Sequence, residues 1–251
     1  MIDSPDKPLF SAKLNAPQRL ADTVTEAIAT ALFDGRIAPG DPLPSEGDIA
    51  KEFGVSKPVA REALRQLSGV GLIHTQQGKV ARAKALTGEP LDRIYGYAVR
   101  ASLTRLREAN EMRRVVETGI ARLAAERRDP KGISALAAAV QTMHDTLGQP
   151  DRFTEADIAF HLGMALATGN AMIRMQVEGM RSVQREVSEL FSQRSNRTLD
   201  DWRDTVRRHV ALFQAIRDGD PDRAVQLIDA HYQAADIASL EVAGDMDGAD
   251  G

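Results

Sequence analysis

The chain has 251 residues, 43% of them hydrophobic, and a formal net charge of −4 at neutral pH, which together favour two packed domains over one. It has no cysteine, so disulfides and thiolate metal sites are excluded. No apolar run reaches the roughly 18 residues needed to cross a membrane, and the first residues lack the pattern of a signal peptide, so we expect a cytoplasmic protein with no membrane partner.

A first helix is predicted around residues 20–32, and two short helices joined by a tight turn follow within residues 43–67. Ser45 is placed to cap the first short helix, and Gly54 is placed to end it. Ser56 is expected to cap the second, where Pro58 is tolerated because it falls in the first turn.

The second short helix carries a cationic stripe, because its basic residues recur every four positions: Lys57, Arg61 and Arg65. This pattern suits a recognition helix in a DNA major groove, and a solvated face on an ordinary helical hairpin is the alternative that it leaves open. Residues 56–82 hold five cationic side chains and one carboxylate, whereas residues 83–251 hold 22 and 26. The positive charge is therefore concentrated where DNA is expected to bind.

A β-hairpin is predicted after this helix, with strands over 72–75 and 80–82 and a tip over 76–79. Residues 83–90 are expected to be a linker. From there on the pattern is almost entirely helical, and we predict helices at 91–102, 106–127, 130–146, 151–167, 171–193, 200–217 and 220–238.

Three histidines fall on apolar faces of the later helices. Asp157 and His161 are four residues apart and project from one side of a single helix, whereas His209 and His231 lie on the last two helices. Three imidazoles and one carboxylate suit zinc, nickel, cobalt or manganese, and facing helices of a bundle can build such a site. Taken singly, each histidine also fits an ordinary core or surface position.

Several short motifs in residues 20–82 are arranged as in the winged helix-turn-helix domain of the GntR family of bacterial transcription regulators, which this segment resembles. They are Asp34–Gly40, Leu43–Glu46, Gly54–Ser56 and Arg61–Leu64. The resemblance implies DNA contacts from Ser45, Ser56, Lys57, Pro58, Val59, Arg61, Arg65, Gln77, Gly78 and Lys79. Two positions depart from the pattern, because Gly47 and Lys57 stand where many members have arginine. Lysine cannot make the bidentate contact of arginine, so the operator is expected to differ.

The C-terminal part resembles the FCD domain of the FadR subfamily, in its metal-binding class. The matching segments are Glu111–Glu117, Asp157–His161 and His209–Asp220. The resemblance implies a helical bundle that holds a metal, zinc first among the candidates, through Asp157, His161, His209 and His231. It also implies a small carboxylate effector, for which Arg113, Arg174 and Arg181 are candidate contacts. For Arg113, a surface ion pair with Glu117 is the alternative.

We therefore predict a mainly α protein, with a winged helix-turn-helix at 16–83 and an antiparallel helical bundle at 91–240. The expected function is a transcription repressor, not an enzyme, that binds a palindromic operator as a homodimer and responds to a small organic acid. A metal-dependent hydrolase is one alternative, but the sequence has no H-E-x-x-H motif to supply a base. A DNA-binding protein with a purely structural metal is the other.

Overall fold

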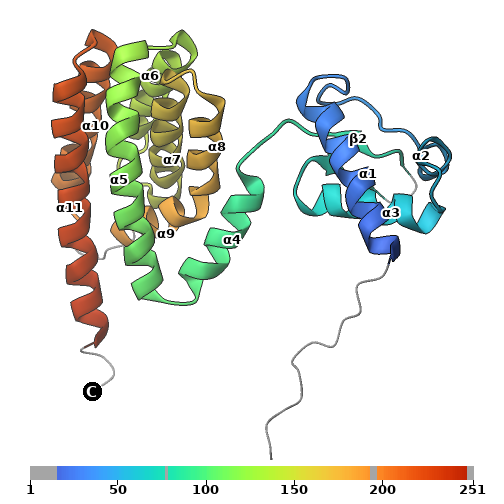
Figure 1. Ribbon diagram of the computed structural model, residues 1–251. Coiled ribbons are helices and arrows are strands. Elements are labelled where there is room, and N and C mark those ends of the chain that lie inside the picture. The colour runs from blue at the N-terminus through green and yellow to red at the C-terminus, as the bar shows by residue number, and fades with distance from the viewer. Residues whose placement is uncertain (1–15, 77–78, 193–196, 248–251) are drawn as a thin grey trace, which may run out of the picture. The chain divides into compact units, whose positions relative to one another are not determined.

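The computed structural model describes residues 16–76, 79–192 and 197–247 (Figure 1). The chain divides into two compact units, Met1–Leu86 and Thr87–Gly251. Gln77 and Gly78, predicted at the tip of the hairpin, lie outside the described residues. Within the described ranges, no helix combines the length and the apolar character that a membrane crossing requires.

In its described residues, the first unit holds three helices and a two-stranded sheet: α1 (Ala16–Phe33), α2 (Glu46–Phe53), α3 (Lys57–Gly69), β1 (Ile73–His74) and β2 (Arg82–Ala83). Ser45 and Asp48 form a capping box at the start of α2, as local sequence rules favour. Gly54 ends α2 with φ +65°, a left-handed conformation that glycine adopts without strain. This turn brings α3 against α2, so the pair is the predicted helix-turn-helix.

The core of the first unit is formed by α1, the buried faces of α2 and α3, and β1. Ala60, Ala63 and Leu67 of α3 are completely buried. The strands β1 and β2 pair antiparallel, with His74 opposite Arg82, and Pro42 bridges to Arg82 on the other side. The returning strand thus begins two residues later and ends one residue later than predicted, because pairing with the segment before α2 extends the sheet to Ala83.

The second unit is all helical in its described residues: α4 (Glu89–Arg100), α5 (Leu103–Arg127), α6 (Pro130–Asp145), α7 (Pro150–Ala167), α8 (Ala171–Gly179), α9 (Arg181–Ser192), α10 (Leu199–Asp218) and α11 (Pro221–Asp247). The longer helices run side by side as a bundle (Figure 1). Helix α7 is the central one, since it packs against α5, α6, α8 and α9 and is buried around most of its circumference. Two polar side chains of α7, those of Thr154 and His161, are therefore buried in the interior of the bundle.

One predicted helix, 171–193, is two helices, α8 and α9, that meet at Met180. At Gly179 a side chain would approach the Leu91 Cβ atom to 2.7 Å, so α8 ends where it meets α4. Asp92 of α4 then caps α9, because its carboxylate accepts hydrogen bonds from the backbone and the hydroxyl of Ser182. The prediction of a single helix was wrong because this cap comes from a distant part of the sequence.

Candidate DNA interface and candidate metal centre

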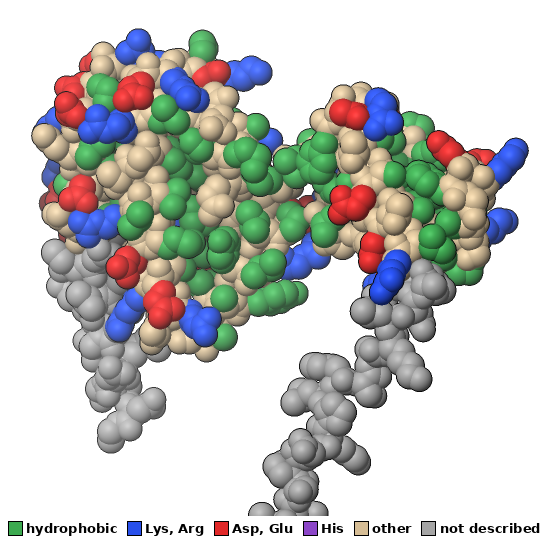
Figure 2. All heavy atoms as spheres, viewed as in Figure 1, with side chains coloured by type: hydrophobic (Ala, Val, Ile, Leu, Met, Phe, Trp, Pro, Cys, Tyr) green, Lys and Arg blue, Asp and Glu red, His purple; other side chains and the backbone are tan. Residues whose placement is uncertain are grey.

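The exposed side of α3 presents the predicted cationic stripe. Lys57 is exposed, and the side chains of Arg61 and Arg65 are 66% and 75% exposed. Arg61 donates two hydrogen bonds to Glu46 of α2, at 2.9 and 2.7 Å, and Arg65 donates to Glu62. On the face of this unit seen in Figure 2, basic side chains likewise lie among acidic ones. A DNA contact from either arginine would require it to exchange a carboxylate for a phosphate or a base.

The remaining predicted DNA contacts are distributed around α3. Ser45, Ser56, Pro58 and Lys79 are exposed, whereas Val59 is 6% exposed and packs in the core. Ser56 occupies the capping position of α3, but its side chain makes no capping hydrogen bond, which corrects the expectation from the sequence. The Ser56 hydroxyl is therefore not committed to the helix.

The four predicted metal ligands come together from three helices. Asp157 and His161 project from α7, His209 from α10 and His231 from α11. His161 and His209 are each 1% exposed, and ligand atoms of the three histidines lie within 4.8 Å of one another. The Nε2 atom of His209 lies 3.0 Å from Oδ1 of Asp157, so the carboxylate joins the cluster.

The orientation of His209 tests whether this cluster fits a metal. Its Nδ1 atom lies 2.8 Å from the carbonyl oxygen of Thr205. Because a carbonyl oxygen can only accept a hydrogen bond, the ring proton of His209 is on Nδ1. The lone pair of Nε2 then faces Asp157, and this buried atom has no hydrogen-bond partner among the described residues. A lone pair and a carboxylate oxygen repel each other unless a cation lies between them. The donor set therefore fits a divalent metal.

Two side chains hold the other ligands in place. The Nδ1 atom of His161 contacts the Glu117 carboxylate, which leaves Nε2, 4.0 Å from Asp157 Oδ1, to face the cluster. Gln184 of α9 donates to the backbone carbonyl of Asp157 at 3.0 Å and to its Oδ2 atom at 3.4 Å. Such outer contacts fix the ring orientation and the carboxylate that a metal site needs.

The protonation states of the cluster also suit a metal. Burial acts to raise the pKa of Glu117, but the charges of His161 and Arg113 outweigh it and lower this pKa to about 2. Burial opposes ionisation of Asp157 too, yet its contact with His209 and the other histidines holds its pKa well below the usual range. Burial and the neighbouring histidines lower the pKa of His231. Ionised carboxylates beside a neutral imidazole are the forms that bind metals.

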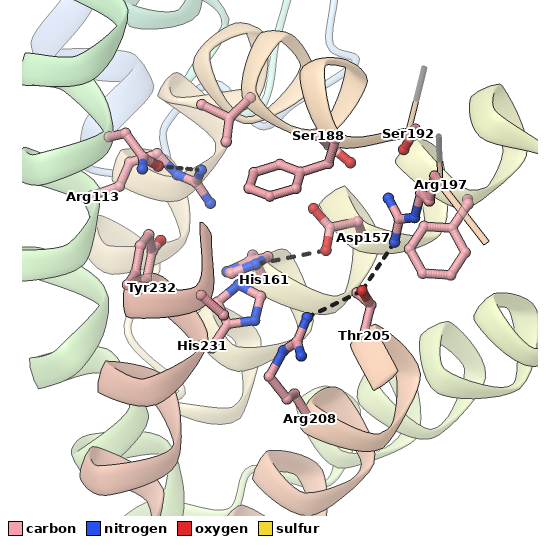
Figure 3. A pocket seen from close by; sticks show the side chains of 15 residues that line it. Arg113, Asp157, His161, Ser188, Ser192, Arg197, Thr205, Arg208, His231 and Tyr232 are labelled. Carbon is pink, nitrogen blue, oxygen red and sulfur yellow. Dashed lines mark hydrogen bonds and ion pairs between the residues drawn. The ribbon is translucent and has the colours of Figure 1, made fainter. Parts of the chain in front are cut away.

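A cavity of about 60 Å³ opens beside the cluster (Figure 3). Asp157, His161 and His231 form part of its wall, together with Arg113, which is 3% exposed. Arg113 donates to Glu117 at 3.2 Å and to Asn110 at 3.4 Å, so the ion pair foreseen as the alternative for Arg113 exists, but it is buried at the cavity. The space is sufficient for a few waters.

The other two candidate effector residues lie elsewhere in the bundle. Arg174 of α8 pairs with Glu178 at 2.7 Å. Arg181 of α9 pairs with Glu155 at 3.0 Å and borders a second hollow, formed by α4, α7, α8 and α9. Neither is among the residues that line the cavity beside the histidines.

Several cavity residues were not identified from the sequence: Tyr232, Arg197, Thr205 and Arg208. Tyr232 and Arg208 are sequence neighbours of two ligands, but adjacent helical positions point in different directions, so adjacency was no signal. Burial and the nearby Glu117 carboxylate raise the pKa of Tyr232 well above its usual range, so its phenol stays neutral. Gln184, which holds Asp157, gave no local signal either.

A winged helix-turn-helix followed by an all-helical domain with an internal cavity defines the class of DNA-binding transcription regulators, which are not enzymes. Residues 20–82 match the sequence profile of bacterial regulatory proteins of the gntR family, and residues 108–234 match that of the FCD domain. The chain therefore belongs to the GntR family and, by its FCD domain, to the FadR subfamily.

Relatives cover nearly the same span. The transcriptional repressor NanR of Klebsiella aerogenes is 26% identical over 226 residues, which is 87% of this chain and 85% of that protein. The galactonate operon transcriptional repressor of Escherichia coli is 29% identical over 209 residues, 82% and 90% of the two chains. A solved GntR structure from Streptococcus agalactiae has a TM-score of 0.63 at 19% identity and covers 85% of this chain and 98% of that one, which supports the fold.

Proposed function

We propose that this protein is a metal-containing transcription repressor whose helical domain binds a small carboxylate effector and thereby changes its affinity for an operator. The observation that carries the proposal is the buried cluster of Asp157, His161, His209 and His231 in the wall of a cavity. A cluster buried for stability alone would not need to border an internal space. The carboxylate and imidazole donors favour zinc, with nickel, cobalt and manganese as alternatives.

The effector is proposed to bind with its carboxylate directed at the metal end of the cavity. A bound metal would supply the positive charge that attracts the carboxylate there. Arg113 adds a second attraction, because a guanidinium can donate two parallel hydrogen bonds to a carboxylate. The name of the galactonate operon repressor links that relative to a sugar acid, which is consistent with a small organic acid as the effector of this chain.

The operator is proposed to contact α3 and the wing. The contacts assigned to it are Ser45, Ser56, Lys57, Pro58, Arg61, Arg65, Gln77, Gly78 and Lys79. One recognition helix reads only a few base pairs, so we propose a homodimer on a palindromic site. Light scattering of the free protein should give twice the mass of the 27.3 kDa chain, and a single species of the monomer mass, with and without DNA, would exclude the dimer.

The substitution His209→Ala tests the metal and effector parts together. It should lower the metal content of the purified protein and its affinity for carboxylates, and it should leave the DNA-binding unit folded and able to bind the operator. Elemental analysis, thermal melting with added zinc and fluorescence anisotropy with operator DNA measure the three effects. A wild-type chain without transition metal, whose melting temperature does not change with zinc, nickel or manganese, would refute the metal site.

The zinc-loaded wild-type protein also distinguishes a metal that takes part in effector binding from a metal with a purely structural role. The zinc-loaded wild-type protein would then gain no thermal stability from any carboxylate, because a ligand that binds the folded state must stabilise it. A carboxylate that raises the melting temperature and changes the anisotropy of the operator complex would establish sensing.

A further inference from the structure

Two arginines converge on one hydroxyl in the wall of the cavity, at a place that the proposed metal and carboxylate do not use. Arg197 and Arg208 each donate a hydrogen bond to Oγ1 of Thr205, at 2.9 and 3.2 Å. In Figure 3 these three side chains lie on one side of Asp157 and His161, and Arg113 and Tyr232 lie on the other. All of them line the same cavity.

Among the described residues, no carboxylate forms an ion pair with the positive charge of Arg208. Its Nε atom is buried without a hydrogen-bond partner, and within the described ranges its guanidinium makes no ion pair. Arg113, in contrast, is matched by Glu117, and Arg207 by Asp204.

Two hydroxyl groups also line the cavity. Ser188 and Ser192 of α9 line it, and both are buried. Ser188 Oγ lies 3.3 Å and Ser192 Oγ 3.4 Å from the Thr154 hydroxyl, so their present hydrogen bonds are long. Hydroxyls next to an arginine can reorient to donate to a bound oxygen anion.

We propose that Arg208, with Arg197 and Thr205, forms an anion subsite, and that the effector carries a second anionic group, a carboxylate or a phosphate, that binds there. The inference rests on the proposed function, because the first carboxylate is assigned to the metal end. A partly buried guanidinium without a counter-ion is costly, and an effector with one carboxylate and an apolar remainder would leave it so. A second anionic group removes this cost through charge-assisted hydrogen bonds.

The test compares matched ligands that differ by one anionic group, by calorimetry with the zinc-loaded full-length protein. One pair is 2-hydroxybutanoate and malate, in which a terminal methyl becomes a carboxylate. The other is glycerate and 3-phosphoglycerate. In at least one pair the compound with the second anionic group should bind about tenfold more tightly or better. The pair that shows this preference identifies the second anionic group of the effector as a carboxylate or as a phosphate.

Arg208→Gln should abolish the preference and leave the affinity for the single-anion compound and for zinc unchanged, and Arg208→Lys should retain part of it. The matched control is Arg207→Gln, which removes an exposed arginine from the same helix and should keep the full preference. Unchanged zinc binding also shows that each variant is folded.

Equal binding within both pairs, or a preference that survives in Arg208→Gln, would overturn the anion subsite and leave the proposed function intact. If none of the four compounds binds the zinc-loaded protein, the carboxylate effector itself is refuted, and the subsite with it.

Discussion

Arg61 is already bound to a carboxylate in the free protein, and this bears on the DNA contact proposed for it. Its two hydrogen bonds to Glu46 join α3 to α2, but both groups are exposed, so the pair contributes little stability. Arg61→Ala should weaken operator binding by about 1–3 kcal/mol and reduce discrimination between sequences, whereas Lys79→Ala should weaken binding to all sequences alike. Anisotropy titrations with operator and scrambled DNA measure both.

The control for Arg61 is Arg36→Ala. Arg36 also pairs with an exposed carboxylate, that of Asp34, but it lies in the turn after α1. Its loss should leave the affinity within experimental error. If Arg61→Ala binds the operator as the wild type does, α3 does not dock in the way proposed.

Gln184 is a positioning residue for the proposed metal site, because its amide holds Asp157 by the backbone and by Oδ2. Oδ1 of Asp157 is thereby left to face the histidines. Gln184→Leu preserves the approximate volume but removes the donor, and it should lower zinc affinity by roughly tenfold, as the loss of outer contacts does elsewhere. Competition with a chromophoric chelator measures this. Unchanged zinc affinity would show that α7 alone orients the carboxylate.

At the scale of single elements, Asp92 decides where α9 begins. Its carboxylate accepts from the backbone N–H of Ser182 and, at 3.0 Å, from the hydroxyl. Asp92→Ala should lower the free energy of unfolding of the helical unit by about 1 kcal/mol, since loss of a cap leaves an N–H without an acceptor. Urea unfolding measures the change. Asp200→Ala, at an exposed position near the start of α10, is the control and should have a much smaller effect.

The two kinds of cap explain which elements could be predicted from the sequence. Ser45 and Gly54 bound α2 through contacts within a few residues, so the helix-turn-helix could be found by reading along the chain. The break between α8 and α9 at Met180 depends on contacts with Asp92 and Leu91, and no pattern in the neighbouring sequence predicts it. The first hairpin strand was found for the same local reasons, while its partner begins two residues later and ends one residue later under the influence of Pro42.

The residues of the candidate site likewise divide into those that local sequence predicts and those that only the packing of distant segments brings in. Asp157 and His161 share a helix face, so their proximity could be deduced from spacing, and the resemblance to the FCD domain added His209 and His231. Gln184 enters through the packing of α9 against α7, and Arg208 and Thr205 enter through the packing of α10 against α5, α6 and α11, which spacing does not reveal.

For the whole molecule, the buried cluster predicts how stability depends on pH when no metal is present. The unfolded chain takes up a proton on His231 near pH 6.5, whereas the lowered pKa of His231 in the folded state resists it. The stability of the metal-free protein should therefore fall as the pH drops below this value, by up to about 1.4 kcal/mol per pH unit for this one proton.

Glu117 adds a second loss at lower pH. Its folded pKa of about 2 lies below its usual value of 4.5, so its contribution is complete above that usual value and disappears as the pH falls towards 2. Melting temperatures in the presence of a chelator, from pH 7.5 to pH 3, should decrease in both ranges. A constant melting temperature between pH 7.5 and pH 5 would show that His231 protonates as readily in the folded state.

The order of the ligands along the chain has a consequence for synthesis. The DNA-binding unit ends at Leu86, and the ligands follow on α7, α10 and finally α11. A ribosome therefore completes the part that holds the operator well before His231 emerges. Under the proposed function, a polypeptide released early, within α10, would retain the DNA-binding unit but lack His231, so an effector could not change its affinity for the operator. Complete translation of α11 would then be a condition for control by the effector.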